Sequence, residues 1–328
     1  MALRPAVAVV GVHKEATPYT YNQPVAAECF PAFDVSWTPS AEMYERTESR
    51  TIMDKLDLIP GTATMEISFK ILLVGQHGGA GTVPYWDDAI MCCGFRETVT
   101  AGTSVAYTPW TTMDAATDAG PPATTNPFEA ASVAVFEDGN VYAASGCMGN
   151  VTFTMTAGQP AVMEFTFKGA YVATVAGAVP TPTGVSTAAP QNFLFASVET
   201  IDGYSSAFET LSYDMGNQVE YITDANSASG IKGSIIVDRR ITGSFNPDAE
   251  AVGDDDIYAS WRAGTTGNID TGAIGTGAGQ MWTIAATRCQ YRSLSPGERA
   301  GFRTHDVAFD VVSATGASEG ASFSLTFT

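Results

Sequence analysis

The residue types that could perform catalysis or bind a metal are few and widely spaced in this chain. Its three histidines, His13, His77 and His305, are too far apart in sequence to form a metal-binding motif. Cys92 and Cys93 could supply a nucleophile, but nothing around them matches a known nucleophile setting. We interpret them as thiols packed on one face of a helix. The sequence therefore predicts no catalytic, cofactor-binding or metal-binding residue and no cofactor.

Two short motifs suggest ligand sites without meeting their requirements. The loop at residues 75–82 is rich in glycine, but it lacks both the Gly-Lys-Ser/Thr ending of a phosphate loop and the Rossmann spacing. Asp254, Asp255 and Asp256 lack the alternating oxygen ligands and the distal Glu of a calcium loop. We expect these aspartates to begin a helix, where acidic side chains stabilise the first turn.

The composition favours a β-rich protein from a reducing compartment. Hydrophobic residues make up 45% of the 328 residues and charged residues 16%, so a large core is possible. The 32 glycines, with abundant Thr and Ala, favour sheets and loops over helical bundles. The five cysteines form neither a disulfide framework nor a CxxC site. We therefore expect reduced thiols in a protein made in a cytoplasm.

The chain is strongly acidic, with a formal net charge of −19 and a pI near 4.3. Such a surface repels the phosphate backbone, which argues against sequence-specific binding of DNA. The charge serves either solubility or a surface that must lie near nucleic acid without adhering to it. No apolar run approaches the ~18 residues of a membrane-spanning helix. The apolar residues 6–12 are interpreted as a strand or an extended arm, not as a signal peptide.

Alternating and punctuating residues predict the elements of the first half. Residues 65–71 alternate between apolar and polar side chains, as in a strand with one buried face. Pro84 marks the start of a helix and Gly94 its end. A hairpin turn is predicted at residues 137–139, and a second at residues 157–159, between the strands of residues 151–167.

The second half repeats this order of elements. A strand at residues 240–245 is followed by a helix that Asp254, Asp255 and Asp256 begin and Gly264 ends. A strand pair then spans residues 290–311, with its turn predicted at residues 296–298. The succession of strand, helix and hairpin thus occurs twice, which predicts a duplicated β-rich unit. A duplicated unit with no evident active site suggests a building block and not a catalyst.

These patterns divide the chain into four segments. We predict an N-terminal arm at residues 1–24, a first domain at 25–173, a linker at 174–192 and a second domain at 193–328. The linker consists mainly of Ala, Gly, Pro and Thr. Residues 100–131, rich in Thr, Ala and Pro, are predicted to form a long surface loop.

The last six residues, 323–328, alternate like a strand and have no polar tail. Proteins normally protect such an edge from uncontrolled pairing. We therefore expect this strand to pair either within its own protomer or with a neighbouring copy.

Several short motifs follow one another in a distinctive order along nearly the whole chain. They are Gly-Gly-Ala-Gly-Thr-Val-Pro-Tyr-Trp and Cys-Gly-Phe-Arg-Glu within residues 75–98, Tyr-Thr-Pro at 107–109, Glu-Asp-Gly-Asn at 137–140, Gly-Asn-Val at 149–151, Ala-Gly-Gln at 157–159, Phe-Thr-Phe-Lys-Gly at 165–169 and Val-Asp-Arg-Arg-Ile-Thr-Gly-Ser-Phe-Asn-Pro-Asp at 237–248. This order resembles that of the tail tube proteins (major tail proteins) of long-tailed, siphovirus-type bacteriophages. The chain departs from the pattern at Cys92, where a small residue is more familiar, and in the loop that begins at Gly75.

The resemblance implies a mainly β fold with two tandem β-sandwich or half-barrel domains, each flanked by a short α-helix. Members of this family close their sheets into a β-barrel ring, and the rings stack into a hollow tube. Single-domain members form hexameric rings, so three copies of a duplicated chain would form a pseudo-hexamer. The resemblance thus implies a structural virion protein of the phage tail, not an enzyme, assembled in the host cytoplasm.

The same resemblance implies the partners. The chain would bind itself in homotrimeric rings, surround a tape-measure protein during assembly, and contact the distal tail and tail-terminator proteins, with no membrane. Double-stranded DNA would pass during genome ejection without specific binding, because a negative lumen forgoes the counterion release that holds DNA. We therefore expect much of the charge of −19 to face the channel. The alternative is another β-rich virion surface module, such as a decoration protein or an adhesin, which would form no tube.

Overall fold

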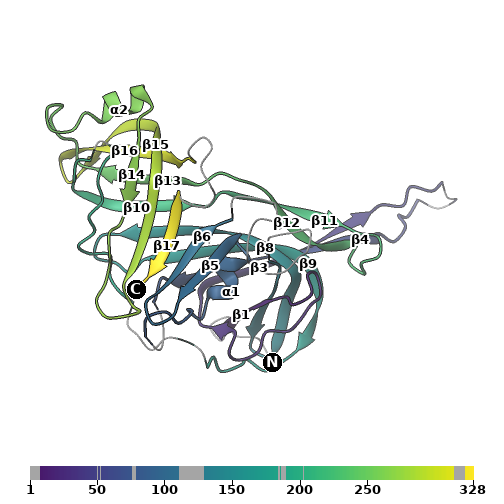
Figure 1. Ribbon diagram of the computed structural model, residues 1–328. Helices are drawn as coiled ribbons and strands as arrows, with labels where there is room; N and C mark the ends of the chain where they lie inside the picture. The colour runs from purple at the N-terminus through teal and green to yellow at the C-terminus, as the bar shows by residue number, and fades with distance from the viewer. Residues whose placement is uncertain are drawn as a thin grey trace.

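The computed structural model describes residues 8–49, 51, 53–75, 79–110, 129–183, 185, 190–201, 203–313 and 322–328. Within these residues the fold is mainly β, with two short helices, as the sequence predicts (Figure 1). The strands that precede the predicted linker are β1 (Ala8–Lys14), β2 (Cys29–Phe30), β3 (Phe33–Tyr44), β4 (Ile59–Leu72), β5 (Phe95–Thr100), β6 (Ser104–Pro109), β7 (Ala131–Glu137), β8 (Asn140–Thr156) and β9 (Val162–Ala176). Those that follow are β10 (Phe208–Asp214), β11 (Asn217–Thr223), β12 (Ile231–Arg239), β13 (Thr242–Pro247), β14 (Thr266–Asp270), β15 (Trp282–Arg299), β16 (Phe302–Val311) and β17 (Phe323–Phe327).

A single antiparallel path runs through both halves of the chain, in the order β3-β4-β9-β8-β10-β13-β16-β15. Its first four strands, which we name the first set, follow the same internal order as its last four, the second set. In each set, two strands come first in chain order. A hairpin then follows in reversed order, so that its later strand lies beside the second strand: β9 beside β4, and β16 beside β13. The two sets therefore share one strand order, while the duplication of a whole domain stays a prediction.

The flanking elements repeat in the same way. Helix α1 (Asp87–Met91) lies in sequence between β4 and β8, and helix α2 (Ile257–Ala263) between β13 and β15. Strand β7 pairs with the first half of β8, and β14 pairs with the first half of β15. Strands β5 and β6 have no such counterpart, and β6 pairs with β17 of the other half.

The two halves share one hydrophobic core. Met65, Ile67, Phe69 and Ile71 are buried, as the alternation of β4 predicts. Phe323 of the C-terminal strand contacts the rings of Phe95, Phe153 and Tyr213, which come from both halves. This strand pairs internally with β15 and β6, so the expectation of internal pairing is confirmed. The domain boundaries themselves stay a prediction.

Both predicted helices are present, but α1 begins three residues after Pro84 and ends three residues before Gly94. The side chain of Asp256 accepts a hydrogen bond of 2.9 Å from the backbone N–H of Ala259, which caps α2. Gly264 ends this helix with a φ of +65°, and Gly94 adopts a φ of +79° after α1. Trp86, next to α1, is completely buried.

The predicted turn at residues 296–298 is wrong. Strand β15 continues to Arg299, and Pro296 pairs with His305 of β16. The turn lies at Ala300 and Gly301, whose φ angles of +47° and +87° fit a tight two-residue hairpin. Pro296 is compatible with this strand because one edge of β15 has no partner there among the described residues, so no ladder hydrogen bond is lost.

Three other segments also differ from the sequence prediction or extend it. The predicted loop at 100–131 is wrong at its start, where β6 pairs with β5 because Val105 and Tyr107 alternate into the core; residues 111–128 lie outside the described residues. Strand β9 continues to Ala176, inside the range predicted as linker. Residues 8–14 form β1, which pairs with β7, in agreement with the strand interpretation of the apolar N-terminal segment.

Candidate assembly surfaces

The backbone junction between the two sets is a short antiparallel ladder. Residues 152–156 of β8 pair with residues 210–214 of β10. Leu211 and Tyr213 point from this junction into the core and are buried. The hydroxyl of Tyr213 donates to the carbonyl of Ile269 at 2.6 Å, which links the junction to β14. The last strand of the first set thus binds the first strand of the second set.

A second contact between the halves is the hairpin β11–β12, inserted between the first two strands of the second set. It forms its own two-stranded sheet and lies against the middle of β8 and β9. The hydroxyl of Ser234 donates to the carbonyl of Lys168 at 2.7 Å and accepts from the N–H of Met148 at 2.8 Å. Val219 and Ile236 bury apolar surface against Met148. The second half therefore lays a hairpin over the first half.

The base of this hairpin is attached to the end of α1. The guanidinium of Arg239 donates to the carbonyls of Gly94 and Trp110, both at 2.8 Å, and to the side chain of Asn217 at 2.8 Å. Asn217 in turn donates to the carbonyl of Cys93 at 2.7 Å. Burial lowers the pKa of Arg239 to about 10, which still leaves it cationic at neutral pH. Arg239 and Asn217 thus bind the carbonyls of the segment that follows α1 and of Trp110.

Each end of the path from β3 to β15 has an open strand edge within the described part of the protomer, as do β2, β5, β14 and the hairpin β11–β12, which lie off the path or flank it. Strand β3 pairs with β4 alone, and most of its residues are exposed, although Val35 and Trp37 pack partly against the core. The second half of β15, residues 291–299, pairs with β16 on one side. Its other side has no described partner, whereas the corresponding side of β8 holds β10. One end of the path is thus the first strand of a set, β3, and the other end is the last strand of a set, β15. At the internal junction, the first strand of one set, β10, pairs with the last strand of the other, β8.

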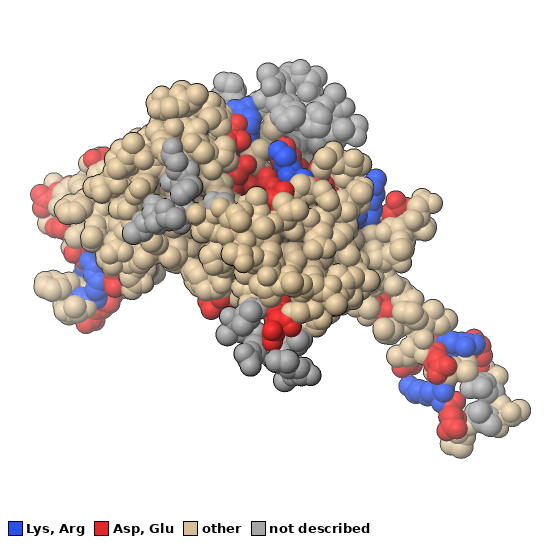
Figure 2. Space-filling model, turned by 90° about the horizontal axis from the view of Figure 1, so that it is seen from below, with Lys and Arg blue, Asp and Glu red and all other residues tan. Residues whose placement is uncertain are grey.

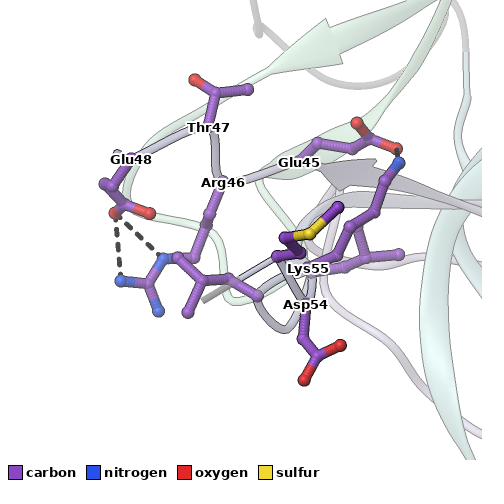
Figure 3. A pocket seen from close by; sticks show the side chains of 9 residues that line it. Glu45, Arg46, Thr47, Glu48, Asp54 and Lys55 are labelled. Atoms are coloured by element: carbon purple, nitrogen blue, oxygen red, sulfur yellow. Dashed lines mark hydrogen bonds and ion pairs between the residues drawn. The ribbon is translucent and has the colours of Figure 1, made fainter. Parts of the chain in front are cut away.

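A projecting hairpin, residues 42–60, extends from the open edge where β3 ends and β4 begins (Figures 1 and 2). A small hollow at its tip is bordered by the ion pairs Arg46–Glu48, at 3.0 Å, and Lys55–Glu45, at 3.2 Å (Figure 3). Such exposed pairs stabilise a fold by well under ~1 kcal/mol. The large apolar side chains on the hairpin are exposed: Met43, Tyr44, Met53, Leu58 and Ile59.

Helix α2 presents an aromatic surface, which we name the α2 face: Tyr258, Trp261 and Arg262. Tyr258 is 46% exposed and Trp261 43%, whereas Trp86 beside α1 is fully buried. The indole N–H of Trp261 donates to the carbonyl of Arg292 at 3.3 Å, which fixes the ring against β15. Clustered exposed aromatic side chains are typical of interaction sites.

The residues that sequence analysis considered for chemistry lie apart. His13 bonds Glu28 at 2.7 Å near β1, and His305 packs its ring against Tyr258; His77 lies outside the described residues. All five cysteines are buried and free. Burial raises the pKa of Cys93 and Cys92, so both thiols are protonated at neutral pH. No group of His, Cys, Asp or Glu within the described ranges could hold a metal ion.

The glycine-rich loop has a packing explanation. A Cβ on Gly75 would lie 2.5 Å from the carbonyl oxygen of Gly279, so the backbones of two distant loops meet here. Only glycine permits this approach. Residues 76–78 of the loop lie outside the described residues.

Sequence reasoning missed a carboxylate cluster at the start of α1. Burial and the neighbouring Glu97 raise the pKa of Asp87 to about 7, although Tyr107 donates a hydrogen bond of 2.8 Å to it. The backbone N–H of Lys14 donates to Asp88 at 3.1 Å, and the Lys14 ammonium lies 3.2 Å from Glu129. The cluster attaches β1 to the helix. No periodicity in the sequence brings these four segments together.

Among the described residues, no helix has the length and apolar character needed to cross a bilayer. A family model described as phage tail tube protein matches residues 5–320, nearly the whole chain. No curated protein matches the sequence.

Proposed function

The chain belongs to the phage tail tube protein family, and we therefore propose that it is the repeating subunit of the tail tube of a long-tailed, siphovirus-type bacteriophage. Three copies close into a ring, and rings stack into the hollow conduit through which double-stranded DNA leaves the virion. Assembly takes place in the host cytoplasm around a tape-measure protein. The distal tail and tail-terminator proteins bound the finished tube. In this proposal the chain is a structural component and not an enzyme.

One observation carries the ring proposal. The junction between β8 and β10 joins the last strand of one set to the first strand of the next. The same junction, repeated between copies, joins residues 291–295 of β15 to residues 33–38 of β3 in a neighbouring protomer. Both edges are open in the protomer, and their pairing satisfies backbone groups that proteins otherwise protect. In this proposal the rotation at the repeated junction closes after six sets, as in the hexameric rings that the family resemblance implies, so a chain that carries two sets gives three-fold symmetry.

The division of the chain supports this arrangement. The proposed first domain, residues 25–173, contains the first set except the end of β9, and the second, residues 193–328, contains the second set. Residues 174–192 connect them, and residues 1–24 add β1 to the outside of β7. Each domain thus supplies one sixth of a pseudo-hexameric barrel.

The face of the shared sheet that points away from the core is the proposed lumen wall. Its side chains include Glu66 and Lys70 on β4, Glu164 and Lys168 on β9, Thr152, Thr154 and Thr156 on β8, Ser212 and Asp214 on β10, Ser244 on β13, and Asp306 and Asp310 on β16. Carboxylates outnumber lysines among them, Asp310 also pairs with the exposed Arg240, and hydroxyls fill much of the rest. Such a wall offers DNA few cations to exchange for its counterions. A tube map with a neutral or basic lumen would contradict this part of the proposal.

The test combines imaging with cysteine pairing. Ser36→Cys and Thr38→Cys are each combined with Ser293→Cys and Ser295→Cys, because directly opposed residues of antiparallel strands bring Cβ atoms within disulfide reach. We expect one combination to form a disulfide between protomers under mild oxidation, and negative-stain images to show rings or tubes. A protein that stays monomeric at high concentration, with no crosslinked combination, would contradict ring formation. It would favour the alternative of a decoration protein or adhesin, for which the exposed α2 face is the motivating observation.

A further inference from the structure

We infer that the projecting hairpin of one copy docks on the α2 face of the neighbouring copy whose β15 pairs with its β3. This inference rests on the proposed ring. It adds a specific interface, outside the shared sheet, and assigns an occupant to the exposed aromatic surface of α2.

The contact inside the protomer is the model for this interface. The second set inserts β11–β12 between its first two strands, and this hairpin lies over β8, β9 and the end of α1 of the first set. The first set inserts the projecting hairpin between its own first two strands, β3 and β4. If each set meets its neighbour in the same way, the projecting hairpin lies over β15, β16 and the end of α2 of the next copy, next to Trp261 and Arg262.

The direction of the two insertions agrees with this requirement. In Figure 1, β11–β12 extends from the region of β10 and β13 across the first set toward β4. The projecting hairpin continues in the same direction, beyond β4. A neighbouring copy whose residues 291–295 pair with β3 lies on the side toward which the hairpin projects. Helix α2 of that copy belongs to the second set, as does the pairing strand β15. The tip of β11–β12 supports the base of the projecting hairpin, since Ala63 donates to the carbonyl of Ser229 at 2.9 Å.

The two surfaces match in chemistry. Tyr44 and Ile59 lie opposite each other near the base of the hairpin and are 55% and 52% exposed. In the internal contact, Val219 and Ile236 fill the corresponding place and are buried. The α2 face offers Tyr258 and Trp261 to receive such side chains. Aromatic side chains of this type are the residues that dominate binding energy at interfaces.

Charge also favours the pairing. The hairpin carries an excess of carboxylates, including Glu42, Glu45 and Asp57. The end of α2 carries Arg262, and the exposed Arg292 lies beneath Trp261, whereas Asp254, Asp255 and Asp256 lie at the other end of the helix, so the charge favours a contact at the C-terminal end of α2. Opposite charges at the rim of an apolar contact mainly set orientation and partner choice.

The experiment uses the full chain with Glu45→Cys and Arg262→Cys, treated with a short bis-maleimide under conditions of ring formation. We expect covalent dimers and trimers to be the main products. The matched control joins Glu45→Cys with Thr98→Cys, an exposed position on β5, and should remain monomeric on a denaturing gel. The native cysteines are buried and add little background.

A second variant separates docking from folding. Trp261→Ala should raise the protein concentration needed for ring formation roughly tenfold or more, while Val99→Ala, an exposed change on β5, leaves it unaltered. Circular dichroism checks that both variants fold. If the β3–β15 cysteine pairs crosslink but the Glu45–Arg262 pair does not exceed its control, this inference is overturned and the proposed ring stands. If neither pair crosslinks and no ring forms, the proposed function itself fails.

Discussion

The carboxylate of Glu15 accepts a hydrogen bond of 2.8 Å from the backbone N–H of Gly146, where β8 bends between its two pairing regions. The same oxygen accepts from the hydroxyl of Ser132 at 2.8 Å, and the other oxygen accepts from the N–H of Tyr19 at 2.6 Å. Glu15 is only 6% exposed. A single buried side chain therefore holds the N-terminal segment, β7 and the bend of β8 together.

Glu15→Ala should lower the free energy of unfolding by about 3 kcal/mol, because it leaves buried donors without acceptors. Glu15→Gln keeps an acceptor for Ser132 and Gly146 and should cost about half as much. Chemical denaturation of both variants measures the difference. Equal losses for the two substitutions would show that the acceptor geometry is unimportant.

Asp87 should make the protein less stable as the pH rises through neutrality. Its pKa in the folded protein is about 7, above the ordinary 3.8, because burial and Glu97 disfavour the charged form. The folded state therefore binds more protons than the unfolded state between pH ~4 and ~7, and stability falls as the pH rises through this window. Asp87→Asn keeps an acceptor for Tyr107 and removes the titration.

We expect Asp87→Asn to be more stable than the wild type at pH 8 by an amount on the order of 3 kcal/mol, and no more stable at pH 4. Thermal unfolding of both proteins across this pH range measures the difference in their stability. Taking this difference cancels the effect of net charge that the two proteins share. Asp54→Asn, on the exposed hairpin, is the control and should show no such trend. A stability gain that is independent of pH would refute the assignment.

Arg239 and its neighbour Arg240 should respond very differently to truncation. Arg239→Ala removes the guanidinium donor from the carbonyls of Gly94 and Trp110, of which Gly94 keeps the backbone N–H of Trp110, and we expect a loss of about 2 kcal/mol. Arg240 is exposed and pairs with Asp310, so Arg240→Ala should destabilise the protein far less. Hydrogen exchange measures the local effect: the amides of α1 and β11–β12 should lose protection in Arg239→Ala but not in Arg240→Ala.

Helix α2 should depend on its two ends. Asp256→Ala removes the cap on Ala259, and Gly264→Ala forces a residue with a side chain into a φ of +65°; each should cost about 1 kcal/mol. Gly253→Ala is the control, since a Cβ there meets nothing within 4 Å. Melting temperatures of the three variants test this order. A loss in Gly253→Ala as large as in Gly264→Ala would contradict it.

The sequence alone determined the local elements of this protein. Alternation predicted β4 and the hairpin β8–β9, and the aspartates at 254–256 and Gly264 marked the two ends of α2, because period and capping depend on neighbouring residues. The same local reasoning failed at Pro296, since a proline suits either a turn or an unpaired strand edge, and only the partner strand distinguishes the two. The repeated order of elements was also visible in the sequence.

Tertiary structure decided what those elements do together. The path from β3 to β15, its two open edges and the placement of β11–β12 on the first half depend on pairings between residues far apart in the chain. The burial of Glu15, Asp87 and Arg239 arises where three or more segments meet, and no local pattern encodes such a meeting. For the same reason, the surfaces proposed for assembly could not be predicted from the sequence. Whether a strand edge is open or a tryptophan is exposed depends on which other segments the fold packs against it.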